Sequence, residues 1–211
     1  MNNEMLSGLI GAIVGGLFTL WGTLIDGKRQ ERTNEAESKE KKKNVLIGVK
    51  TEITTLLEVY QSRMMDNMEA YNGEGPFDLI FPITQNNFSF YESNAFYLSS
   101  TKEVTLKATV AFYSSARSLV DSFKYNNVII EELIRKNILY HETQLEIHLQ
   151  DLQNTIAMAT DYGKGLKSIH SETMKKLDIC LCKINEEISE LERRPSRTLG
   201  HKISRILAFR R

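Results

Sequence analysis

The chain has 211 residues, enough for one folded domain with a short additional segment. Its 27 basic and 27 acidic side chains cancel, so the overall charge singles out no partner. The two cysteines, Cys180 and Cys182, stand two positions apart in a helical pattern and point to different faces, which excludes a shared metal or disulfide. We expect both to be reduced residues that take part in packing.

Residues 5–25 contain no charged side chain. As a helix these residues rise about 31 Å, which matches a hydrocarbon core of about 30 Å. A secretory signal would begin with basic residues, and this chain begins Met1-Asn2-Asn3-Glu4. We therefore predict a transmembrane anchor over residues 1–27. The alternative is a buried helix of a soluble domain.

The charges that flank this run indicate its orientation. No Lys or Arg precedes it, whereas residues 28–43 contain seven basic and four acidic side chains. Because the flank richer in Lys and Arg stays in the cytoplasm, we expect a single-pass protein of the bacterial inner membrane with its N-terminus outside. Trp21 then lies near the inner interface, and residues 28–44 form a charged helical stalk.

Small residues recur along one side of the predicted span. In lipid, small side chains let two helix backbones approach closely enough for van der Waals contact. We therefore predict a helix-helix interface, whose partner is either another copy of the chain or a different membrane protein. The alternative is that glycine is common in membrane spans and the spacing is chance. The predicted interface residues are Gly8, Gly11, Gly15, Thr19 and Gly22.

Residues 45–194 have the apolar periodicity of an all-α domain, and we predict an antiparallel, coiled-coil-like bundle of long helices. The first helix ends at the Gly and Pro signals of residues 72–76, and residues 73–99 form an irregular or short-helical cap over the end of the bundle. The inward residues of the first helix are Leu46, Val49, Ile53, Leu56, Tyr60, Met64, Met68 and Tyr71.

The pattern Ser100-Thr101-Lys102-Glu103 has the form of a capping box and predicts the start of the next helix, which we expect to end near Asn126 and Asn127. A further helix follows, and the last stretch has coiled-coil spacing that Pro195 closes. The further helix points Ile130, Leu133, Ile134, Ile138, Leu145, Leu149, Leu152 and Ile156 inward. The last stretch points Leu177, Leu181, Ile184, Ile188 and Leu191 inward.

Gly163 and Gly165 leave two interpretations open. They form an inter-helix turn, or they lie inside one helix where a neighbour packs closely. We favour the turn, because four antiparallel helices return the C-terminal tail to the membrane.

That tail, residues 195–211, combines basic and apolar residues. We expect it to bind the surface of anionic lipid; nucleic acid would attract the same charges, and a solubilising tail is the third interpretation. Its basic residues include Arg197, Lys202, Arg205, Arg210 and Arg211.

No pattern of residues indicates chemistry. The chain has no phosphate-binding glycine loop, no nucleophile elbow and no zinc-protease motif. Its four histidines are dispersed, and His141 and His148, a heptad apart on one predicted helix face, are too distant to share a metal. We therefore predict no catalytic, cofactor-binding or metal-binding residues, no small-molecule substrate, and a non-enzymatic interaction or scaffold protein.

A resemblance adds to this prediction. Small, functionally unassigned bacterial inner-membrane proteins with one glycine-rich N-terminal span and a cytosolic helical domain resemble this chain in three segments, SGLIGAIVGGLFTLWGTLI, FYESNAFYL and VAFYSSARSLVDSF. Some proteins of this plan are similar to membrane-anchored components of anti-phage systems. The resemblance thus implies an alternative role as a membrane effector or sensor subunit in phage defence. The basic tail leaves a further alternative, a membrane-tethered nucleic-acid sensor.

Overall fold

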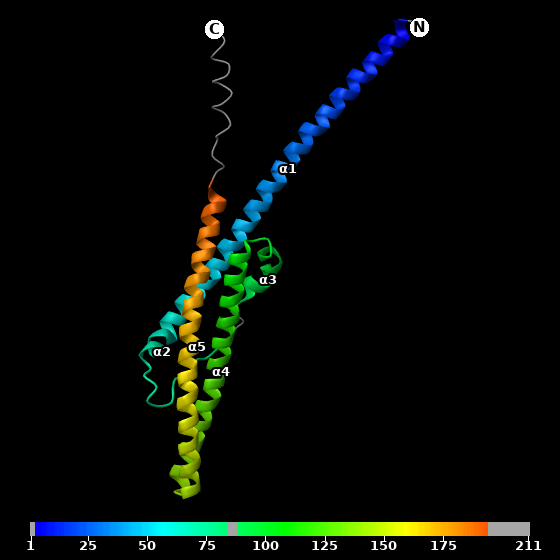
Figure 1. The fold of residues 1–211 in the computed structure, drawn as a ribbon. Helices are drawn as coiled ribbons and strands as arrows, with labels where there is room; N and C mark the ends of the chain where they lie inside the picture. The colour runs from blue at the N-terminus through cyan, green and yellow to red at the C-terminus, as the bar shows by residue number, and fades with distance from the viewer. Residues whose placement is uncertain (1–2, 84–87, 194–211) are drawn as a thin grey trace, which may run out of the picture. The chain divides into compact units, whose positions relative to one another are not determined.

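The computed structural model describes the backbone of residues 3–83 and 88–193, and within these ranges the side chains from Thr19 onward (Figure 1). Every regular element in these ranges is helical, which confirms the all-α prediction. By internal contacts the chain divides into residues 1–44 and a second unit that begins at Val45. The elements are α1 (Asn3–Tyr60), the π-helical turn η1 (Gln61–Met65), α2 (Asp66–Ala70), α3 (Ser89–Leu98), α4 (Glu103–Thr143) and α5 (Glu146–Glu192).

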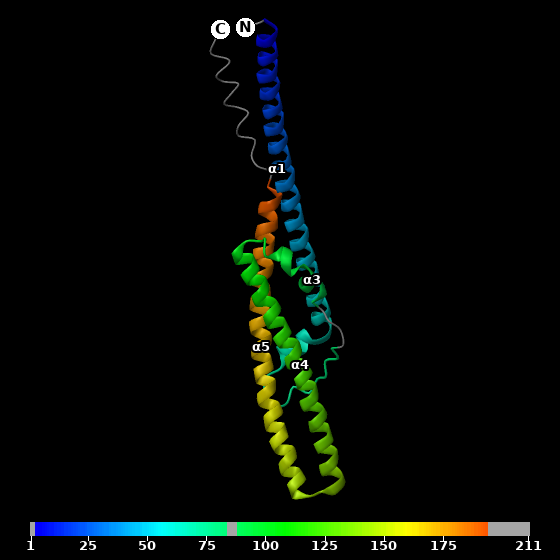
Figure 2. The ribbon, with the colours of Figure 1, turned by 90° about the vertical axis from the view of Figure 1, so that its right-hand side faces the viewer.

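Helices α4 and α5 form one long antiparallel hairpin (Figures 1 and 2). The chain reverses at Gln144, whose φ of 52° is left-handed and whose backbone N–H donates to the Tyr140 carbonyl at 2.8 Å. The predicted break near Asn126 and the turn at Gly163 are therefore wrong, because α4 and α5 run through these positions without interruption. Residues 103–192 give two helices where we expected three.

Gly163 lies inside α5 because a neighbour packs closely against it, the second of the two interpretations. A Cβ atom built there would lie 2.5 Å from the Tyr71 hydroxyl oxygen and 3.2 Å from Phe77 Cβ. A Cβ atom on Gly165 would meet nothing within 4 Å. The first glycine thus serves tertiary packing and neither serves a turn.

Asn126 and Asn127 hold the irregular segment 71–83 against the side of α4. The Asn126 side-chain amide donates to the Phe77 carbonyl at 3.0 Å. Asn127 accepts the Phe81 backbone N–H at 3.0 Å and donates to the Phe81 carbonyl at 2.8 Å. The segment therefore packs along the middle of α4, not over the end of the bundle as predicted. These amides satisfy backbone groups that a non-helical segment would leave unpaired.

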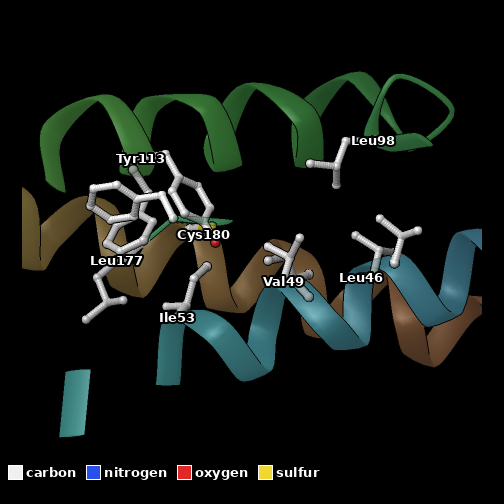
Figure 3. Packing of buried hydrophobic residues seen from close by; sticks show 11 residues of the cluster. Leu46, Val49, Ile53, Leu98, Tyr113, Leu177 and Cys180 are labelled. Atoms are coloured by element: carbon white, nitrogen blue, oxygen red, sulfur yellow. The ribbon is translucent and has the colours of Figure 1, made fainter. Parts of the chain in front are cut away.

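The main core forms where residues 45–57 of α1 pack against α4 and α5 (Figure 3). Leu46, Val49 and Ile53 are fully buried, as their spacing predicted. A second cluster lies farther along the chain and includes Met64, Met68, Phe77, Leu119, Phe123 and Leu166.

The two cysteines differ in their surroundings. Cys180 is fully buried in the main core, whereas Cys182 is exposed and hydrogen-bonded to Glu186. The predicted packing role is thus confirmed for Cys180 and wrong for Cys182, because a two-residue step in a helix turns a side chain away from the core.

Helix α4 begins at Glu103, but the predicted capping box does not form. The N-cap residue is Lys102, whose side chain makes no cap bond. Its backbone N–H donates instead to both carboxylate oxygens of Glu187 on α5, at 3.0 and 3.2 Å. The Ser100 and Thr101 hydroxyls bond back to carbonyls of α3. The buried Glu187 thus accepts the N-cap backbone N–H, as a capping box would have required of Glu103.

In the half of the hairpin next to its turn, residues 130–156, several side chains are more exposed than predicted. Ile130 and Leu152 are buried as expected. Four predicted inward residues are nevertheless exposed, because α2 and the irregular segment do not extend over this half of the hairpin (Figures 1 and 2). Their exposed fractions are 49% for Ile134, 51% for Ile138, 52% for Leu145 and 39% for Ile156. The turn at Gln144 also places His141 on α4 and His148 on α5, not on one helix as predicted.

Candidate functional site

The first candidate is the apolar part of α1. Leu20, Trp21, Leu24 and Ile25 are each between 60% and 66% exposed. They fall in the charge-free run that the sequence analysis singled out. Large apolar side chains gain free energy when they leave water, by about 25 cal/mol per Å² of buried surface. This part of α1 therefore favours an apolar environment or an apolar partner.

The predicted small-residue stripe belongs to the same helix. The backbone of α1 is helical through Gly8, Gly11, Gly15, Thr19 and Gly22, so steps of three and four residues keep these positions on one side. A Cβ atom on Gly22 would meet nothing within 4 Å, which leaves room for another backbone. Of residues 5–18 the structure describes the backbone alone.

A further finding concerns the predicted transmembrane anchor. Among the residues whose side chains the structure describes, no helix has the length and apolar character needed to cross a membrane.

The second candidate is a half-open cavity of about 540 Å³ lined by residues of α1, α4, α5 and the irregular segment. Its lining is largely apolar, with Ile53, Phe112 and Met174 from the three long helices. Tyr60 and Arg63 also line it, and Arg63 lies on the π-helical turn η1. The cavity has the size and lining of a site for an apolar group. Residues 84–87, which adjoin its lining residue Ile83, lie outside the described residues.

A tyrosine-histidine pair lies beside this cavity. The Tyr60 hydroxyl and His170 Nδ1 are 2.8 Å apart, and the His170 side chain is buried. Burial raises the pKa of Tyr60, with a smaller contribution from Glu69. Burial lowers the pKa of His170, Lys167 lowers it further, and Glu69 opposes both. The pair is therefore a hydrogen bond between two neutral side chains, as is typical of a structural contact.

The lowered pKa of His170 predicts a loss of stability in acid. Below its ordinary pKa of 6.5, an unfolded chain takes up a proton at this histidine that the folded chain resists, so folding weakens as the pH falls. The effect is at most about 1.4 kcal/mol per pH unit. In denaturant titrations from about pH 7.5 to about pH 5.5, His170→Gln should show a weaker pH dependence than the natural chain. Equal slopes for the natural chain and His170→Gln would contradict the prediction.

A carboxylate that the sequence analysis missed joins three helices. Glu52 of α1 accepts the backbone N–H groups of Phe90 and Tyr91, at 2.7 and 3.1 Å, and the Tyr113 hydroxyl at 2.6 Å. The sequence holds a signal for it, since Glu52 continues the helical series of Val45 and Val49 toward the core. Its role is structural, because all three donors belong to the fold.

Among the described residues, no three or more His, Cys, Asp or Glu side chains lie close enough together to hold a metal ion. The predicted membrane-surface residues lie outside the described residues; these are Arg197, Lys202, Arg205, Arg210 and Arg211. Comparison with protein families, with curated proteins and with solved structures finds no match for the chain.

Proposed function

We propose that the protein is a membrane-anchored, non-enzymatic helical scaffold of the bacterial inner membrane, with residues 5–25 as its single span. The observation that carries the proposal is the exposed apolar set around Trp21 and Leu24, which continues the charge-free run in one helix. Lipid would remove these side chains from water without a protein core. The helical unit from Val45 onward then stands in the cytoplasm as an interaction domain.

The bonds that the polar side chains make within the fold also support a scaffold. Glu52 and Glu187 cap helices, and His170 bonds to Tyr60. A reaction needs polar groups that converge on space open to a substrate, whereas these groups are bonded to the fold itself. We propose that binding, not catalysis, is the activity of this unit.

Fractionation of cells tests the anchor. The full chain is expected in the membrane pellet, resistant to extraction by high salt and released by detergent. A variant that lacks residues 1–27 is expected in the aqueous fraction. A periplasmic reporter fused after Glu40 should be inactive, since the stalk is placed inside. Recovery of the full chain as a monomer without detergent would exclude the anchor, and an active reporter would reverse the orientation.

The small-residue stripe is tested in the same membranes. Gly11→Leu combined with Gly15→Leu fills the proposed contact, and the detergent-solubilised oligomer should dissociate. Gly16→Leu makes the same change off the stripe and should leave the oligomer intact. An unchanged oligomer in the first variant, or dissociation in both, would exclude the stripe as the interface.

A further inference from the structure

The half-open cavity lined by α1, α4 and α5 has a buried apolar floor and an exposed mouth. Ile53 and Phe112 line it and are almost fully buried, so they belong to the floor. Thr55, Val59 and Arg63 line it as well, and all three are exposed, at steps of four residues along α1 and η1. A molecule in this cavity would meet apolar groups at one end and a cation at the other. The lining therefore favours an amphiphile with an anionic head.

Arg63 is the one charged residue among the described residues that line the cavity. Within the described ranges it forms no ion pair, although Asp66 stands three positions after it. Other polar groups of the lining are bonded within the fold: the Tyr60 hydroxyl contacts His170 Nδ1, and the Thr173 hydroxyl donates to a carbonyl of its own helix. The Arg63 guanidinium is thus free to bind a carboxylate, whose two oxygens match its parallel N–H donors.

The volume of the cavity limits the size of the amphiphile. A methylene group takes up about the same space as a water molecule in the liquid, about 30 Å³, so the cavity of about 540 Å³ holds one chain of about 18 carbon atoms. The two acyl chains of a membrane phospholipid exceed this space. The chain's own residues 195–211 are disfavoured by charge, because they contain five Lys or Arg and no Asp or Glu, and Arg63 would repel them.

We propose that the cavity binds a long-chain fatty acid, with its hydrocarbon chain against the floor and its carboxylate on Arg63. Each methylene group that leaves water favours binding, while the carboxylate stays at the mouth, in contact with both water and the guanidinium. The inference goes beyond the proposed scaffold. It does not depend on the membrane anchor, since all the described residues that line the cavity belong to the unit from Val45 onward.

Photolabelling locates the ligand. The full chain is held in nanodiscs of zwitterionic lipid, because a detergent would itself compete for the cavity. The probe is hexadecanoic acid with a diazirine near the end of its chain, and mass spectrometry should find the label on peptides that contain Phe112 or Leu177, which line the cavity. Plain hexadecanoic acid should displace the probe at a concentration about fivefold lower than hexadecanol or hexadecylamine, because only the acid pairs with Arg63.

Two pairs of matched variants test the two ends of the cavity. Arg63→Gln should raise the concentration of hexadecanoic acid needed for displacement about fivefold, whereas Arg135→Gln, outside the lining, should leave it unchanged. Ala116→Leu places a larger side chain in the cavity and should remove most of the label, whereas Ala157→Leu makes the same change at an exposed position of α5 and should keep it. Equal helical content in all variants excludes unfolding as the cause.

Three results would overturn the proposal. The first is label confined to residues 5–25, which would report the bilayer alone. The second is equal displacement by the acid, the alcohol and the amine, or equal behaviour of Arg63→Gln and Arg135→Gln. The third is label near Phe112 or Leu177 that appears only after residues 195–211 are removed, because the chain's own C-terminal segment would then occupy the cavity. Should fractionation place the chain in water, the same series is run without nanodiscs, so the anchor and the fatty-acid site are tested separately.

Discussion

Gly163→Ala should destabilise the helical unit by about 2 kcal/mol, whereas Gly165→Ala should stabilise it by about 0.5 to 1 kcal/mol. Both positions lie within α5, so both variants gain the same helix propensity. They differ in space. The new Cβ atom lies 2.5 Å from the Tyr71 hydroxyl oxygen at the first position and meets nothing within 4 Å at the second. The difference between the two stability changes therefore measures the effect of the contact with Tyr71 alone.

Tyr71 has little freedom to move away from a new methyl group. Its hydroxyl bonds to the Gly75 carbonyl at 2.6 Å and the Thr160 carbonyl at 3.3 Å, and its ring packs on Phe77 at a centroid distance of 5.4 Å. Because the hydroxyl has one hydrogen to donate, a shift breaks one hydrogen bond, which is worth about 1 kcal/mol. Tyr71 is also the C-cap residue of α2, so it lies where α2 ends and the irregular segment begins.

Denaturant midpoints followed by circular dichroism check both variants in the same mild detergent. A double variant adds Tyr71→Leu to Gly163→Ala, and it should recover part of the loss because the obstructing hydroxyl is gone. If Gly163→Ala is as stable as Gly165→Ala, the close packing of Tyr71 on α5 is wrong.

The helices could largely be predicted from the sequence, because they follow from periodicity. The inward face of residues 46–68 is found where the spacing placed it, and so is Ile184 of the coiled-coil pattern. These signals are local and depend on 3.6 residues per turn.

The connections between the helices were less predictable, because they depend on tertiary contacts. Gly163 suggests a turn by its type, yet a tyrosine more than 90 positions earlier in the chain explains it. The true turn lies at Gln144, a residue type with no turn preference that adopts a left-handed conformation. Asn126 and Asn127 likewise suggested a helix end, and their amides instead bind the irregular segment.

The error in helix number and the exposure of the hairpin half next to its turn have one cause. Ile134 and Ile138 have the spacing of core residues, and a bundle of four helices within one chain would bury them. One chain supplies only the hairpin in this half. The spacing therefore predicts burial that the described part of the chain does not provide at Ile134 and Ile138. Periodicity identifies the apolar side of a helix, but it does not state how many helices cover that side.

Glu52→Ala should lower the free energy of unfolding by about 3 kcal/mol, although Glu52 lies on no candidate binding surface. Phe88, the N-cap residue of α3, makes no side-chain cap bond. The Glu52 carboxylate takes this role from α1 through the backbone N–H groups of Phe90 and Tyr91. Its negative charge also lies at the positive end of the α3 dipole, which is favourable. A ten-residue helix is too short to be stable without such support.

The same substitution leaves a second group unpaired. The Tyr113 hydroxyl donates to Glu52 at 2.6 Å, and Tyr113 is almost fully buried, with its ring stacked on Tyr91 at a centroid distance of 3.9 Å. A buried hydroxyl without an acceptor costs about 1 to 3 kcal/mol. Glu52→Gln keeps one acceptor oxygen and should lose about half as much as Glu52→Ala.

Hydrogen exchange over residues 89–98 and denaturant midpoints measure the two parts of this effect. Protection of α3 should fall in Glu52→Ala and fall less in Glu52→Gln, because the loss begins at the uncapped helix. Glu58→Ala, an exposed glutamate on the same helix, is the control and should stay within about 0.5 kcal/mol of the natural chain. Equal midpoints for Glu52→Ala and Glu58→Ala would show that α3 is held without the carboxylate, and α1 would then contribute only apolar contacts to the fold.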